Sequence, residues 1–109
     1  MEAERARELL ARERARIEGE LRGIAPDANG ESEATGDDAA ELYEAELDAG
    51  QAVDLRAELA AVERAEERLA NGRFGLSVES GEPIPDARLE AVPTAERTIT
   101  EQERYDAGH

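Results

Sequence analysis

Residues 72–101 read GRFGLSVESGEPIPDARLEAVPTAERTITE, a stretch in which glycine and proline recur between short apolar segments. Glycine and proline interrupt regular structure, so the pattern is typical of a small unit built from turns and short elements. Six apolar side chains are spread along it, and we expect them to pack together as its core: Phe74, Leu76, Ile84, Leu89, Val92 and Ile99. The stability of this segment should come from that packing.

The stretch resembles the C-terminal finger of the DksA/TraR family of RNA-polymerase-binding regulators. The shared pattern is Phe74-Gly75, then Gly81 and Ile84, followed by Arg88-Leu89-Glu90-Ala91 and Pro93-Thr94-Ala95. The motif covers the last third of the chain, and the general layout of the family covers most of it. By this resemblance, the structural core of the finger is formed by Phe74, Gly75, Gly81, Ile84, Leu89 and Pro93.

The family binds zinc through two C-x2-C pairs, and those positions hold Ser77 and Ser80, and Thr98 and Glu101. The chain contains no cysteine at all. Structural zinc takes Cys or His ligands, whereas hydroxyls and one carboxylate would give a weak site of hard oxygen atoms. We therefore predict no metal and no cofactor, with the family's zinc absent. We expect the hydroxyls to hydrogen-bond across the former metal position, each bond contributing on the order of 1 kcal/mol.

Length and charge limit the classes of function. A chain of 109 residues forms one small domain, or a hairpin with an appendage. No apolar run has the length of a membrane span, and the first residues lack the hydrophobic segment of a signal peptide, so we expect a cytoplasmic protein without a membrane partner. The 28 acidic residues outnumber the 13 basic ones, giving a formal charge of −15. Phosphate would be repelled, so we expect no direct sequence-specific binding to nucleic acid, and a positively lined protein cleft is a better partner.

The first 71 residues predict two helices. Residues 2–22 are rich in Ala, Glu, Arg and Leu, and their apolar stripe consists of Ala3, Ala6, Leu10, Ile17 and Leu21. An acidic loop is expected over about residues 23–36. A second helix is expected over about residues 37–70, where Asn71-Gly72 supplies the end signal.

Within the second helix, a seam repeats at intervals of three and four residues: Ala52, Leu55, Leu59, Val62, Glu66 and Leu69. Leu42, Tyr43, Leu47 and Val53 should extend the apolar side toward the loop. The chain is thus predicted to be mainly α. Residues 1–71 would form an antiparallel two-helix coiled-coil hairpin, and residues 72–109 a cysteine-less finger and tail with a short C-terminal helix. We expect a monomer.

The loop end of the hairpin is strongly negative, because no basic residue lies between Arg22 and Arg56. In the DksA/TraR family, two acids and an alanine at this tip reach through the secondary channel of the polymerase toward its catalytic magnesium. Counting back from Ser77, the second acid falls on Asp37 and the alanine on Ala39.

The position of the first tip acid holds Ala34, a departure from the family pattern, although Glu33 and Asp38 lie nearby. A purely local role for Asp37 is the alternative, because acids in the first turn of a helix cap free N–H groups and offset its dipole. Arg88 also falls on a family position. It contacts the partner, or it pairs on the surface with one of three acids, Glu90, Glu96 or Glu101.

Together these observations predict a transcription regulator that binds RNA polymerase and inserts the acidic hairpin tip into the secondary channel to modulate initiation. The protein is not expected to be an enzyme, because the sequence shows no catalytic dyad or triad and no phosphate-binding glycine loop. The alternative is an adaptor or dimerisation module, a helical hairpin that no longer binds the polymerase.

Overall fold

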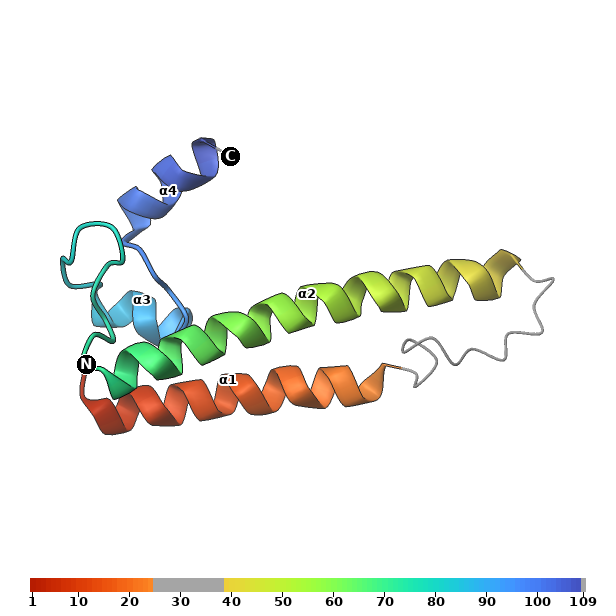
Figure 1. Ribbon diagram of the computed structural model, residues 1–109, viewed down its shortest axis with the longest axis horizontal. Coiled ribbons are helices and arrows are strands. Elements are labelled where there is room, and N and C mark those ends of the chain that lie inside the picture. The colour runs from red at the N-terminus through yellow and green to blue at the C-terminus, as the bar shows by residue number, and fades with distance from the viewer. Residues whose placement is uncertain (25–38, 109) are drawn as a thin grey trace. The chain divides into compact units, whose positions relative to one another are not determined.

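The computed structural model describes residues 1–24 and 39–108, with the backbone alone for residues 39–46. Four helices are present in these ranges: α1 (Ala3–Gly23), α2 (Ala39–Ala70), α3 (Asp86–Ala91) and α4 (Ile99–Ala107) (Figure 1). The described residues contain no strand, only an isolated antiparallel bridge between Leu76 and Pro83. The predicted fold class, a helical hairpin followed by a finger segment, is confirmed. None of the described helices combines the length and apolar character needed to cross a membrane.

The chain forms two compact units, and both long helices contribute to each of them. We call Met1–Glu13 together with Ala61–His109 the finger unit, and Arg14–Ala60 the hairpin unit. The boundary predicted at residue 72 separates the hairpin segment from the finger segment along the sequence, and it stays a prediction. In the finger unit, α3 and the segment around it pack against the helices, so the finger and the adjoining helix ends form one folded body.

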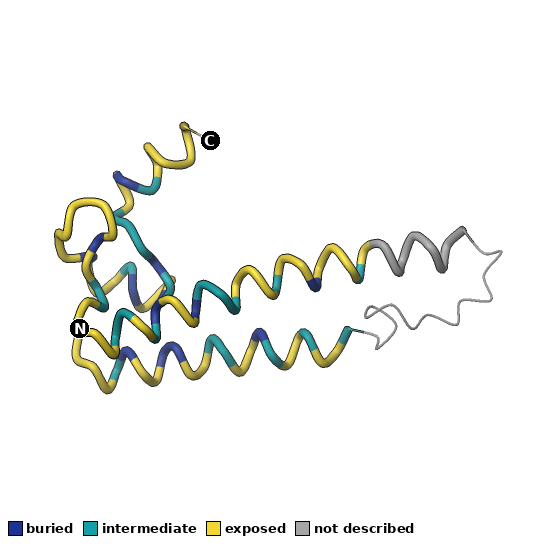
Figure 2. Tube along the Cα trace, in the orientation of Figure 1, coloured by how far each residue is buried: buried dark blue, intermediate teal, exposed yellow. Residues whose placement is uncertain are grey.

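In the finger unit, the start of α1 and the end of α2 lie side by side and antiparallel (Figure 1). Buried residues lie along both helices in this unit (Figure 2), and they are Ala6, Leu9 and Leu10 of α1 and Val62 and Ala65 of α2. Spacings of three and four residues place these side chains on one face of each helix. The predicted seam is wrong at one step, because Ala65 is fully buried while Glu66 is only half-buried.

In the hairpin unit, Ile17 and Ala52 are buried. Three leucines around them are half-buried, namely Leu21, Leu55 and Leu59. The predicted extension of the apolar side is wrong at Leu47 and Val53, whose exposed fractions are 48% and 62%. The side chains of Leu42 and Tyr43 lie outside the described residues. The apolar contact between the helices is therefore narrow in this unit.

The chain leaves α2 through a glycine turn. The Gly72 N–H donates to the Leu69 carbonyl over 3.2 Å, and the Arg73 N–H donates to the Arg68 carbonyl over 2.8 Å. This pair of bonds is the Schellman arrangement, which needs a left-handed residue, and Gly72 supplies it with φ of 72°. The turn reverses the chain into the finger immediately after the helix.

The core of the finger consists of Ile84, Leu89 and Ala95, with Phe74 packed against them. Gly75 brings the backbone close to this core: its carbonyl accepts the Ile84 N–H over 2.7 Å, and a Cβ added to it would lie 3.5 Å from a Leu89 methyl. The predicted core included three residues that the structure leaves exposed: Leu76, Val92 and Ile99, at 38%, 42% and 55%. Ala95, which was not predicted, belongs to the core, and Pro93, which the resemblance placed there, is buried.

An ion pair joins α3 to α1. The Arg5 guanidinium donates to both carboxylate oxygens of Glu90, with the Nε–Oε2 distance at 2.7 Å. This bidentate hydrogen bonding raises the pKa of Arg5 and lowers the pKa of Glu90. It fixes α3, and with it Leu89, against the start of the chain.

Candidate functional site

Two of the former metal-ligand positions lie in a tight turn that is built around a serine hydroxyl. Ser77 is 5% exposed, and its Oγ accepts the backbone N–H groups of Glu79 over 3.1 Å and of Ser80 over 3.2 Å. The turn closes through the Ser77 N–H, which donates to the Glu82 carbonyl over 2.8 Å. Gly81 has φ of 76°, a backbone conformation that residues with a side chain rarely adopt. The Ser77 hydroxyl oxygen thus accepts hydrogen bonds from two backbone N–H groups of this turn.

The other two ligand positions form the start of α4. Thr98 is the N-cap, and its Oγ1 accepts the Glu101 N–H over 3.2 Å. In return, the Glu101 carboxylate accepts the Thr98 N–H over 2.9 Å. This reciprocal capping box satisfies two backbone donors at the end of the helix. Thr98 and Glu101 are therefore fixed relative to each other by local bonds.

The two pairs meet at the Glu101 carboxylate. Hydrogen bonds from the Ser77 and Ser80 hydroxyls reach it, in addition to those from Thr98. These donors, led by Ser77, lower the pKa of Glu101 to about 2, because they stabilise its ionised form. The side chain is only 5% exposed. We expected the hydroxyls to hydrogen-bond across the former metal position, and in the structure the buried Glu101 carboxylate accepts bonds from them. We call Ser77, Ser80, Thr98 and Glu101 the carboxylate cluster.

The carboxylate cluster does not fit zinc. It offers three hydroxyls and one carboxylate, and these oxygens already hydrogen-bond to one another and to the backbone. Neutral hydroxyls are poor ligands for a metal that selects thiolate and imidazole. Over residues 1–24 and 39–108, no group of three or more His, Cys, Asp or Glu side chains is placed to hold a metal ion. The arrangement can perform a structural task, joining the turn to α4.

A second polar cluster, which the sequence did not reveal, joins the finger to α2. Arg64 and Arg68 both contact the Glu96 carboxylate, each at 3.2 Å. The Val78 N–H donates to the Glu96 carbonyl over 2.8 Å, so the same residue also holds the serine turn. Burial lowers the pKa of Arg68. Glu96 lies 28 and 32 positions from these arginines, and no local pattern could have predicted their pairing.

The predicted surface ion pair of Arg88 is wrong for the described part of the chain. Arg88 is half-buried, and its Nε donates to the Arg97 carbonyl over 2.9 Å. The candidate acids are otherwise engaged, Glu90 with Arg5 and Glu96 with α2. Arg88 therefore supports the backbone immediately before α4.

The tip residues proposed from the sequence cannot be placed in the same way. Asp37 and Asp38 lie outside the described residues, and Ala39 is the first residue of α2, with its side chain outside the description. Arg88 belongs to the finger unit and Ala39 to the hairpin unit. Of the predicted site residues, the structure brings together the four former ligand positions.

These features define a class of protein, a helical hairpin that carries a zinc-finger-like segment. The family described as prokaryotic dksA/traR C4-type zinc finger matches residues 78–107. The solved structure of transcription factor DksA2 from Pseudomonas aeruginosa matches with a TM-score of 0.72 and 31% identity, covering 96% of this chain and 83% of that one. The chain belongs to the DksA/TraR family.

Two curated relatives match over shorter stretches. Uncharacterized protein YteA of Bacillus subtilis (strain 168) is 41% identical over 71 residues, covering 65% of this chain and 29% of that protein. RNA polymerase-binding transcription factor DksA of Caulobacter vibrioides is 44% identical over 45 residues, covering 41% of this chain and 32% of that protein. The matched stretch is thus about a third or less of the length of these relatives.

Proposed function

We propose that the chain is a transcription regulator that binds RNA polymerase and inserts the acidic end of its hairpin into the secondary channel to modulate initiation. The observation that carries this proposal is the likeness to transcription factor DksA2 over 96% of the chain. A further relative is named for binding RNA polymerase. The proposed contacts are Asp37, Asp38, Ala39 and Arg88.

The charge of the chain supports this mode of action. The segment between Arg22 and Arg56 contains acidic residues and no basic ones, within a chain whose net charge is −15. An acidic probe is attracted by a basic-lined channel, and such attraction speeds association at low salt. Insertion of the hairpin requires no catalytic residue in the chain, which agrees with the family's role in transcription.

Replacing Asp37 with alanine should reduce the effect on transcription while leaving polymerase binding within about twofold, because one solvated charge contributes little to affinity. The measurements are the Kd for purified RNA polymerase and the transcript yield from a purified promoter. Glu67→Ala is the control, since Glu67 is an exposed acid near the other end of α2.

Equal transcript yields with the Asp37 variant and the unmodified chain would contradict insertion of the tip. No measurable affinity for the polymerase would contradict the whole proposal. If sedimentation then showed a tight dimer, the adaptor function would be favoured.

We also propose that the finger folds without zinc, supported by the donor chemistry of the carboxylate cluster. Excess EDTA should leave the melting temperature unchanged within about 1 °C, because a structural zinc would contribute far more to folding. Added zinc chloride should not raise it either, since a ligand stabilises only what it binds. A loss of several degrees with EDTA would disprove the proposal, and a zinc-containing member of the family is the positive control.

A further inference from the structure

Each of the two long helices contains a glycine that neither backbone geometry nor packing requires. Gly19 in α1 and Gly50 in α2 are exposed, and both lie inside their helices. The positive φ angles of the described glycines all belong to turns outside these helices, so Gly19 and Gly50 have ordinary helical φ. A Cβ at Gly50 would meet nothing within 4 Å, and one at Gly19 would lie 3.9 Å from an Arg22 nitrogen. Alanine would therefore fit at both positions.

The two glycines weaken the helices that contain them. Apart from proline, glycine is the least favourable residue in a helix interior, because its backbone loses the most freedom on folding. Both glycines belong to the hairpin unit, whereas the described helical segments of the finger unit contain no interior glycine. The loss of helix stability is thus confined to one unit of the chain.

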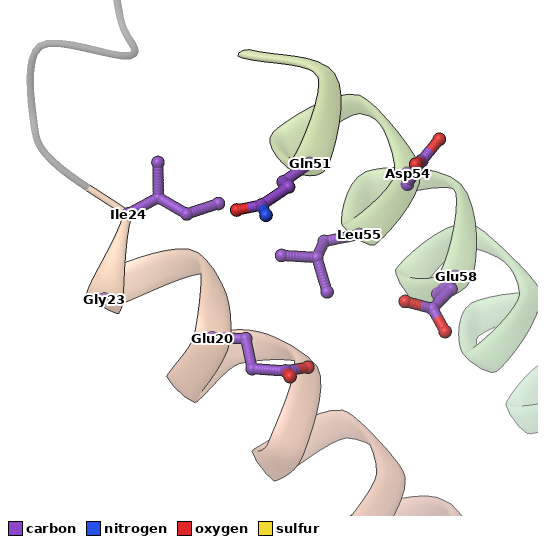
Figure 3. Close-up of a pocket in the computed structure, with 7 residues that line it drawn as sticks. All are labelled: Glu20, Gly23, Ile24, Gln51, Asp54, Leu55 and Glu58. Atoms are coloured by element: carbon purple, nitrogen blue, oxygen red, sulfur yellow. The ribbon is translucent and has the colours of Figure 1, made fainter. Parts of the chain in front are cut away.

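Apolar packing between the helices is also sparse in the hairpin unit. Among the described side chains of this unit, the buried apolar residues are Ile17 and Ala52. A pocket with a volume of about 500 Å³, open to solvent, lies between the last turn of α1 and α2. Figure 3 shows the side chains of Ile24 and Leu55 extending into this space. The helices therefore meet here without a continuous apolar core.

The ion pairs that Arg14 and Arg16 make with described acids contribute little to holding the two helices together. Arg14 contacts Glu18 at 3.3 Å and Arg16 contacts Glu20 at 2.6 Å. Both pairs lie within α1, so they can persist when the helices separate. The Arg16–Glu58 contact at 3.4 Å joins α1 to α2, but its side chains are 44% and 51% exposed. Such solvated pairs add little to stability.

We propose that the hairpin unit opens locally while the finger unit stays folded, and that Gly19 and Gly50 set how often it opens. Parts of one protein open with different free energies, and a unit with few buried apolar contacts opens more often. The glycines add to this tendency, because they lower the stability of both helices in the same unit.

Opening of this unit regulates the binding of a partner at the hairpin tip. The proposed contacts Asp37 and Asp38 directly precede α2, which begins at Ala39. A chain whose helices have separated no longer presents these residues in one arrangement, so the open population lowers the apparent affinity. That the partner is RNA polymerase rests on the proposed function, while the opening itself rests on the glycines and the packing of the hairpin unit.

Native-state hydrogen exchange, measured by NMR on the full chain, tests the local opening. The backbone amides of Ile17, Ala52 and Leu55 should be at least about tenfold less protected than those of Val62 and Leu89. Equal protection in the two units would overturn the inference.

A change confined to the finger core provides an independent check. Ile84→Val removes a methyl group from a side chain that is 3% exposed, and it should lower the protection of the Leu89 amide by about two- to tenfold. The protection of Ala52 and Leu55 should stay the same, because local opening of the hairpin unit does not involve the finger core. A parallel loss of protection at Ala52 and Leu55 would show that the chain opens only as a whole, which would overturn the inference.

Alanine substitution tests the role of the glycines. Gly50→Ala should raise the protection of Ala52 and Leu55 by about four- to fivefold, as expected from the helix propensities of glycine and alanine. Adding Gly19→Ala should raise it further. Unchanged protection in the Gly50→Ala protein would overturn the inference.

Two further variants of α2 serve as controls for Gly50→Ala. Gln51→Ala should leave the protection unchanged, because Gln51 is the exposed neighbour of Gly50 and glutamine forms helices nearly as well as alanine. Ala57→Gly, also at an exposed position, should lower the protection by about four- to fivefold. A rise with Gln51→Ala as large as that with Gly50→Ala would contradict the assignment to glycine.

Hydrogen exchange followed by mass spectrometry separates this inference from the proposed function. RNA polymerase at about ten times its Kd should slow exchange in the hairpin unit by about tenfold, because a partner that binds the closed form stabilises it. If the polymerase binds and leaves this exchange unchanged, the regulatory role of the opening is wrong. If the polymerase does not bind while Gly50→Ala still raises the protection, the proposed function fails and the local opening is confirmed.

Discussion

Replacing Leu89 with alanine is expected to lower the free energy of unfolding of the finger unit by about 2–5 kcal/mol. Leu89 is 1% exposed and lies at the centre of the core formed with Ile84, Ala95 and Phe74. The small core offers few neighbours that could move into the cavity, so most of the lost contact should remain lost. The measurement is chemical denaturation followed by circular dichroism, with backbone NMR to identify the residues that unfold.

Leu76→Ala is the matched control, because it is the same substitution on the same finger. The Leu76 side chain is 38% exposed and lies outside the core cluster, so its loss should cost only about 0.5 kcal/mol. Similar losses for the two variants would contradict the placement of the core. The comparison tests whether the apolar contacts around Leu89 hold the finger together.

Replacing Glu101 with glutamine is expected to lower the melting temperature by more than Thr98→Ala does. The loss of an N-cap hydroxyl such as that of Thr98 costs about 1 kcal/mol, or roughly 4–8 °C in a domain of this size. Glu101 has a larger role, because its carboxylate accepts bonds from the serine turn and from the cap of α4. Glutamine preserves the shape but replaces one oxygen by a donor and removes the charge. Glu103→Gln, on the exposed face of α4, is the control.

Low pH should abolish the difference in melting temperature between the unmodified chain and Glu101→Gln. The folded-state pKa of Glu101 is lowered from 4.5 to about 2, so its ionised form stabilises the fold fully above about pH 4.5, and that stabilisation is lost as the pH falls toward 2. The gap in melting temperature between the unmodified chain and Glu101→Gln should therefore be constant from pH 7 to about 5 and shrink below that. A constant gap down to pH 2 would show that the carboxylate charge is unimportant. The difference between the two proteins cancels the titration of the other acids.

Much of the architecture could be predicted from local sequence. The runs of good helix formers and the glycine turn after residue 70 act between near neighbours, so α1 and α2 were predictable. The absence of cysteine and the resemblance of the finger to the family could also be read directly from the sequence. Two features were not predictable. One is the burial of Ala65 in the seam, and the other is the exposure of Leu76, Val92 and Ile99. A short apolar pattern does not reveal which face of a segment turns toward its neighbours.

The sequence by itself determined a two-helix chain with an acidic middle and a finger without metal ligands, because helix propensity, turn residues and donor chemistry depend on residue type and short spacing. Only the tertiary structure decided that the Glu101 carboxylate meets the serine turn, that Glu96 meets Arg64 and Arg68, and that acids of both helices surround one pocket. Each of these contacts joins residues far apart in the chain. Their partners are chosen by the packing of the apolar core, which fixes where the segments lie, and a short sequence pattern carries no record of that choice.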